Sequence, residues 1–119
     1  MSNTASETSL KAAGRKWLKT LPFCEVTNIA ASIYGDNGIP DTHVNLRGFT
    51  IWIEWKKPGR DCDNFVPAAP REYLQQRFIE KQIAAGGFGF FCSDLVRLKQ
   101  QIEEILTIIN KMEDYLKHG

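Results

Sequence analysis

Two strand-like segments joined by a short turn, within residues 42–56, constrain the fold more than any other part of this chain. The runs THVNL and FTIWIEWK flank Arg47-Gly48, a pair typical of tight hairpins. Because side chains alternate along a strand, the second run has an apolar face and a mixed face. The apolar face carries Ile51, Ile53 and Trp55, and the mixed face carries Trp52, Glu54 and Lys56.

Helical and strand-like patterns alternate along the rest of the chain, which predicts an α/β fold with a small mixed sheet flanked by helices. Prolines and glycines separate the segments, most densely in the loop 57–70. The predicted elements are a helix from about Ser6 to Leu21, a strand at 25–34 followed by a turn at 35–38, the hairpin, a helix at 71–87, a strand at 88–92 and a long final helix.

The ends of the predicted helices carry recognisable signals. Thr4 or Ser6 is expected to cap the first helix, and Pro22 to end it. Gly86 and the glycine after it are expected to stop the second helix. Ser93 is expected to cap the final helix, with an acidic residue following in its first turn.

The final helix carries an apolar stripe at heptad spacing over about three heptads. A helix of about 25 residues is roughly 37 Å long, more than the diameter of a domain of this size, so its C-terminal half should overhang the core. Two interpretations follow: the stripe packs on the chain's own sheet or first helix, or part of it forms a dimer contact. Its members are Leu95, Leu98, Ile102, Ile105, Ile109, Met112 and Leu116.

Length and charge narrow the class of protein. With 119 residues we expect a single domain over 1–119, and the net charge of +1 is too small for a protein that coats nucleic acid by charge alone. The three cysteines show neither a zinc spacing nor a disulfide framework, and the N-terminus lacks the pattern of a signal peptide. We therefore expect a protein of the reducing cytoplasm, without a membrane span.

Three charged residues of the hairpin region form a candidate catalytic site. Asp41 precedes the first strand, and Glu54 and Lys56 end the second, so pairing of the strands should bring the two carboxylates together. Converging carboxylates suit Mg²⁺ or Mn²⁺, with the main-chain carbonyl of Trp55 as a third ligand, and a lysine can offset charge that develops on a phosphate. The alternative is a cross-strand charge pair on a solvated face.

If the chain binds nucleic acid, basic residues elsewhere are the candidates for contact with its phosphates. Lys57 and Arg60 follow the candidate site, and a row on the first helix forms the densest basic patch. A solvated loop and a solvated helix face are the alternatives. The row on the first helix consists of Lys11, Arg15 and Lys19.

The segments GIPD, GFTIWIEWKKPG and LQQRFIEKQIAAGG, in this order, resemble the virus-type replication-repair nuclease (VRR-NUC) domain, a branch of the PD-(D/E)XK nuclease superfamily. The resemblance covers about residues 6–98 and leaves 99–119 as a C-terminal helical extension. It implies a restriction-endonuclease-like core in the order helix, three strands, helix, strand. The matching positions are Gly38 to Asp41, Glu54 to Lys56, Gln75, Ala85 to Gly87 and Ser93.

The resemblance also implies roles for individual residues. Asp41 and Glu54 would be the metal-binding acids, Lys56 the catalytic lysine, and Gln75, rather than its neighbour Gln76, the helix glutamine that supports the site. Glu7 is the best match to an accessory acid on the first helix. Trp55 departs from the family pattern, which has small or aliphatic residues there.

The function so implied is a metal-dependent, structure-specific DNA endonuclease of a bacterial cell or a phage-infected host. Branched DNA, including the four-way (Holliday) junction, is the implied substrate, and a homodimer would supply two sites related by a two-fold axis. One alternative is a non-catalytic module that binds DNA or protein in a replication or repair complex. A nickase within a larger replication complex is another.

Overall fold

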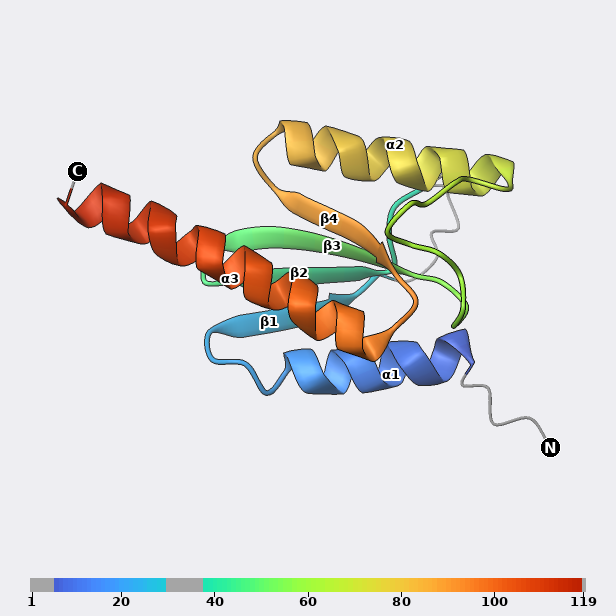
Figure 1. Ribbon diagram of the computed structural model, residues 1–119, viewed down its shortest axis with the longest axis horizontal. Coiled ribbons are helices and arrows are strands. Elements are labelled where there is room, and N and C mark those ends of the chain that lie inside the picture. Colours follow the sequence, from blue (N-terminus) through green and yellow to red (C-terminus); the bar gives the residue numbers. More distant parts are fainter. Residues whose placement is uncertain (1–5, 30–37, 119) are drawn as a thin grey trace.

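The computed structural model describes residues 6–29 and 38–118 (Figure 1). In that part of the chain the elements follow the predicted order, with one helix before three strands and a second helix before the fourth strand. The elements are α1 (Glu7–Leu18), β1 (Cys24–Asn28), β2 (Thr42–Leu46), β3 (Phe49–Trp55), α2 (Pro70–Ala84), β4 (Phe88–Cys92) and α3 (Leu95–His118).

The four strands form one mixed sheet in the order β1-β2-β3-β4. The first three strands are antiparallel neighbours, and β4 returns parallel to β3 after the crossover through α2. Helix α2 lies on one side of the sheet, and α1 and α3 lie together on the other (Figure 1). The predicted α/β class and the mixed sheet are confirmed.

The turn between β2 and β3 has the backbone of a tight hairpin. Arg47 and Gly48 have φ angles of 54° and 92°, and left-handed conformations at both central positions match the twist of the flanking strands. The amide of Gly48 donates to Oδ1 of Asn45 at 2.9 Å. The Arg47 guanidinium reaches α3, where it contacts Asn110 at 2.8 Å and pairs with Glu113.

Alternation along β3 divides the molecule into two environments. Ile51, Ile53 and Trp55 are fully buried in the core with α1 and α3. Trp52 points the other way and meets the ring of Phe78 on α2 edge-on at 5.1 Å. At the end of β3 the side chain of Trp55 therefore lies in the main core, and that of Glu54 lies on the face that α2 covers.

Trp55 fits because the helix beneath it carries a glycine. Gly14 is buried in α1, and a Cβ built there would overlap Cη2 of Trp55 and lie 2.8 Å from Cζ3. The indole N–H donates to Thr42 Oγ1 at 2.8 Å, so the buried tryptophan is also hydrogen-bonded. The space left by Gly14 and the hydrogen bond to Thr42 explain how the chain accommodates a tryptophan at position 55, where the resembled family has small or aliphatic residues.

The bounds of two elements differ from expectation. Helix α1 is capped by Ser6 as predicted, but it ends at Leu18, and tighter turns lead to Pro22. The strand predicted at 25–34 covers Cys24–Asn28, and residues 30–37 of that strand and turn lie outside the described residues.

The predicted cap of the final helix is wrong. The Ser93 hydroxyl instead donates to the carbonyl of Arg60 at 2.6 Å. The carboxylate of Asp94 accepts from the amide of Val96 at 3.3 Å, so Asp94 serves the helix N-terminus. The side chain of Ser93 therefore binds the loop that follows β3 and does not cap α3.

The interpretation that the apolar stripe packs on the chain's own sheet and first helix describes the N-terminal part of α3. Leu98, Ile102, Ile105 and Ile109 are buried against the sheet and α1, whereas further along Leu116 is 80% exposed. The helix projects beyond the sheet (Figure 1), and the longest extent of the molecule is 53 Å. Among the described residues no helix is long and apolar enough to cross a membrane.

Replacing Gly14 by alanine should destabilise the protein, although the same change in an exposed helix interior would stabilise it by about 1 kcal/mol. The added methyl group would overlap the Trp55 indole, and overpacking costs about 1–3 kcal/mol. Urea denaturation measures the change. In a Trp55→Phe background, which shortens the opposing ring, the cost should shrink; an equal cost in both backgrounds would contradict the contact.

Candidate active site

The two carboxylates meet at the end of the β2–β3 pair. Thr42 is the register partner of Ile53, so one further step along both strands brings Asp41 opposite Glu54. The Asp41 amide donates to Oε1 of Glu54 at 3.3 Å, and its carbonyl accepts from the amide of Ile29 at 2.8 Å. The main chain around Asp41 is thus fixed by both neighbouring strands.

Glu54 is almost fully buried, with 6% of its surface exposed. Burial and then the charge of Asp41 raise its pKa to about 7, and Glu7 adds to the rise, while Lys56 and the Asp41 amide oppose it. The effect of Glu7 places this predicted accessory acid within electrostatic reach of Glu54. Burial, more than the neighbouring charge of Asp41, therefore favours the neutral form of the Glu54 carboxyl.

Helix α1 supplies two cations to Asp41. Lys11 Nζ lies 3.1 Å from Oδ2 of Asp41. The Arg15 guanidinium donates to the Asp41 carbonyl at 3.1 Å and to Thr42 Oγ1 at 3.2 Å. These two residues of the predicted basic row lie toward the site, whereas Lys19 is exposed.

Lys56 leaves β3 on the side of α2 and is buried there. Its ammonium donates to Oε1 of Gln75 at 2.8 Å and pairs with Oε2 of Glu72 at 3.0 Å. Gln75 is only 2% exposed, and its neighbour Gln76 faces a separate groove. The structure thus brings Gln75, rather than Gln76, to the lysine.

The remaining predicted residues follow Lys56 along the chain. Lys57 is exposed, and Arg60 is half-buried with its guanidinium on Glu72 at 2.8 and 3.0 Å. Arg60 is therefore already paired within the chain. The carbonyl of Trp55 lies between the two strand-end residues Glu54 and Lys56 in the sequence.

Glu72 is the residue that reasoning from the sequence missed. It lies in the first turn of α2, three residues before Gln75. Residues three apart share a helix face, so a carboxylate at this spacing from the expected glutamine was a usable signal. Phe65 and Phe91 were missed too; their rings stack at 3.7 Å beside Lys56.

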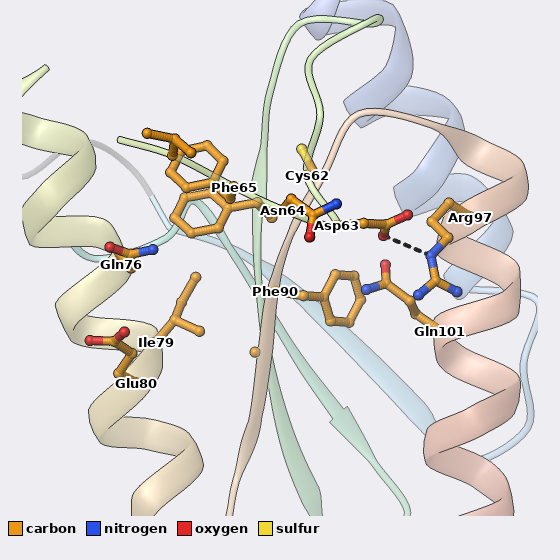
Figure 2. Close-up of a pocket in the computed structure, with 13 residues that line it drawn as sticks. Cys62, Asp63, Asn64, Phe65, Gln76, Ile79, Glu80, Phe90, Arg97 and Gln101 are labelled. Carbon is orange, nitrogen blue, oxygen red and sulfur yellow. Dashed lines mark hydrogen bonds and ion pairs between the residues drawn. The ribbon is translucent and has the colours of Figure 1, made fainter. Parts of the chain in front are cut away.

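A groove of about 640 Å³ runs along β4 between α2 and α3 (Figure 2). Gln76, Ile79 and Glu80 line it from α2, and Arg97 faces it from α3 with an ion pair to Asp63 at 2.9 Å. It shares Phe65 and Phe91 with the surroundings of Lys56, but neither Asp41 nor Glu54 lines it. The groove thus adjoins the candidate site without containing its carboxylates.

Asp41 and Glu54 are suited to a divalent cation because both offer hard oxygen ligands and their charges repel in its absence. Among the described residues no group of three or more His, Cys, Asp or Glu side chains is placed to hold a metal. Two carboxylates, completed by main-chain oxygen and water, fit Mg²⁺, which keeps several waters when it binds to proteins.

Comparison with known proteins places this arrangement among described folds. A solved structure of a VRR_NUC domain superposes with a TM-score of 0.64, covering 83% of this chain and 97% of that one, at 24% identity. The chain has the fold of a VRR-NUC domain. On this fold Asp41 lies directly before β2, Glu54 lies near the end of β3, and Lys56 follows that strand.

Sequence comparison gives a weaker relation. No protein-family model matches the chain. A DNA polymerase III subunit alpha of Streptococcus pyogenes serotype M18 (strain MGAS8232) is 21% identical over 98 residues. The match includes 80% of the VRR-NUC-like chain but only 9% of the polymerase subunit, so the similarity concerns a small part of that protein.

The raised pKa of Glu54 predicts how the stability of the metal-free protein depends on pH. Because the folded pKa of about 7 exceeds the unfolded value of about 4.5, protonated Glu54 stabilises the fold fully below pH 4.5, and this contribution is lost as the pH rises through 7. The loss is up to about 3 kcal/mol. Glu54→Gln should remove it.

Thermal unfolding of both proteins in EDTA between pH 5 and 8 measures the difference. The comparison must be made between variants, because burial lowers the pKa of His43, and this favours stability with rising pH in the same range. A stability difference between wild type and Glu54→Gln that stays constant from pH 5 to 8 would contradict the assignment.

Proposed function

We propose that this protein is a metal-dependent, structure-specific DNA endonuclease that hydrolyses phosphodiester bonds in branched DNA, including four-way junctions. One observation carries the proposal: two carboxylates and a buried lysine converge at neighbouring strand ends, with a glutamine on the lysine. Two metal-binding carboxylates and a lysine supply the charges that phosphate hydrolysis requires.

The comparisons support a role with DNA. The superposed structure is described as a VRR_NUC domain, and the similar sequence belongs to a DNA polymerase subunit. Neither relative is similar enough to transfer an activity. They agree, however, with the chemistry of the site.

Asp41 and Glu54 would hold Mg²⁺ or Mn²⁺, which lowers the pKa of a bound water and polarises the phosphate when present. A bound cation would favour the ionised form of Glu54, since the pKa of about 7 belongs to the metal-free protein. The ammonium of Lys56 is suited to orient that water or to stabilise the negative charge of the transition state.

Contacts with the DNA backbone are proposed for basic residues around this site. Lys19 and Lys57 are exposed and free to reach phosphates. Lys11 and Arg15 already lie at Asp41, where a bound phosphate would add a second anion to their surroundings. A phosphate at Arg60 would compete with Glu72.

A homodimer through the exposed end of α3 completes the proposal. Beyond Ile109 the stripe continues as Met112 and Leu116, which are 44% and 80% exposed, with Tyr115 beside them. Apolar side chains on a projecting helix are stabilised by packing against another copy. Two copies would present two sites, as paired cuts in a symmetric junction require.

The alternative is a module that binds DNA or protein without cleaving it. The Lys11–Asp41 ion pair favours this candidate, because the ammonium neutralises Asp41 without any metal. Cleavage and binding by the same variants separate the two functions.

Purified protein should cut a labelled four-way junction in Mg²⁺ or Mn²⁺ and cut plain duplex more slowly. Lys56→Ala should lower the rate by at least about 100-fold, because it removes charge stabilisation in the transition state. Lys81→Ala, an exposed lysine in the last turn of α2, is the matched control and should retain activity.

Circular dichroism establishes that each variant is folded. If the folded wild type cuts neither junction, flap, duplex nor single strand with either metal, the binding-module alternative replaces the nuclease. Unchanged DNA binding by Asp41→Ala would support that replacement.

Leu116→Glu should shift the protein from dimer toward monomer at micromolar concentration, because it puts a charge into the proposed apolar contact. Light scattering measures the mass. Lys117→Glu changes an adjacent exposed position and should leave the dimer intact. A monomeric wild type would overturn the dimer.

A further inference from the structure

A lysine needs support to act at a defined point, because its four-carbon stem is flexible. Lys56 has such support on several sides. Besides the Gln75 and Glu72 contacts, its ammonium lies 5.8 and 5.7 Å from the ring centroids of Phe65 and Phe91. These side chains come from α2, from the loop after β3 and from β4.

The ammonium has three N–H donors, and Gln75 and Glu72 take two of them. One donor remains. The charge of Lys56 acts on Glu54, so the ammonium lies within electrostatic reach of the carboxylates. The contacts with α2 therefore hold the group while leaving it able to donate to the reaction.

Glu72 is itself firmly held. Its Oε1 accepts from the amide of Ala68 at 2.8 Å and from Arg60 at 2.8 Å, and its Oε2 accepts from Arg60 at 3.0 Å and faces Lys56. These bonds, Arg60 first, lower the pKa of Glu72 to about 2. The carboxylate is thus ionised at neutral pH.

Arg60 is anchored in turn. Its guanidinium donates to the carbonyl of Val66 at 2.8 Å and lies 4.6 Å from the Phe65 ring centroid, and its carbonyl accepts from Ser93. The loop after β3 is therefore clasped between α2 and the end of β4. A continuous set of contacts runs from this loop through Glu72 to the lysine.

From this arrangement we propose that Glu72 is a positioning residue that holds the Lys56 ammonium for phosphodiester hydrolysis. The inference deepens the proposed function and rests on it. Among the described residues the Glu72 carboxylate contacts Arg60, Ala68 and Lys56, and of these three only Lys56 is a proposed reacting group. Its loss should affect the chemical step without removing the two metal-binding acids.

The first test needs no activity. In protein labelled with ¹⁵N-lysine, a hydrogen-bonded and buried ammonium gives a resonance that exposed lysines lose through rapid exchange with water. We expect such a resonance, assigned by its absence in Lys56→Arg, and expect Glu72→Gln to abolish it. Glu80→Gln, an exposed carboxylate two turns further along α2, should leave it unchanged.

The second test is kinetic. Glu72→Gln should lower kcat by about 10- to 100-fold, as loss of supporting residues commonly does, while KM changes less than about 3-fold. The affinity for Mn²⁺, measured by calorimetry, should be unchanged. A rise in KM with unchanged kcat, or a persistent Lys56 resonance in Glu72→Gln, would overturn the proposal.

Arg60→Ala separates the loop from the lysine, because it removes the clasp and leaves the Glu72–Lys56 pair. We expect the Lys56 resonance to persist and kcat to fall less than in Glu72→Gln. An equal fall with the resonance intact would assign the effect to the loop and overturn direct positioning. A folded but inactive wild type would refute the nuclease separately, since the resonance still reports whether Glu72 holds Lys56.

Discussion

The register between β2 and β3 is the constraint on which the rest of this structure depends. With Thr42 opposite Ile53, the next pair is Asp41 and Glu54, and the Asp41 amide donates to the Glu54 carboxylate. Glu54 shares its face of the strand with Trp52, which packs on α2. The same alternation sends Trp55 into the opposite layer, where Gly14 leaves room for its indole. A slip of one residue would exchange the two faces, so core and site stand or fall together.

The charges of the site are balanced in two different ways. Asp41 and Glu54 repel each other, and in the metal-free protein α1 supplies Lys11 to one while the pKa of the other rises. Lys56 is balanced within the chain by Glu72, which Arg60 also neutralises. Asp41 is therefore balanced by an ion pair across elements and Glu54 by its raised pKa, whereas Lys56 is balanced by a carboxylate of α2.

The sequence predicted those features that depend on a periodic pattern of side chains or on residues close together in the chain. Alternation in 49–55 and the Arg47-Gly48 turn predicted the hairpin, and the hairpin brought Asp41 to Glu54. Contacts between distant elements could not be predicted in this way. Lys11 was expected in a basic row for DNA phosphates or on a solvated helix face, and its ion pair with Asp41 was not expected. Ser93 was expected to cap α3 but bonds to the loop. Each outcome depends on how α1 or the loop packs, which no local pattern contains.

The hairpin also joins the candidate site to the projecting end of α3. Glu54 lies at one end of β3, and the turn lies at the other. Arg47 of this turn donates to Asn110 of α3 and forms an ion pair with Glu113. The seven residues between these ends span roughly 20 Å of extended backbone. The strand pair thus fixes the distance and the angle between the exposed end of α3 and the two carboxylates. The length of β2 and β3 therefore sets the distance between the exposed end of α3 and the candidate site. Adding two residues to each strand would lengthen this distance by about 7 Å without exchanging the two faces of the hairpin.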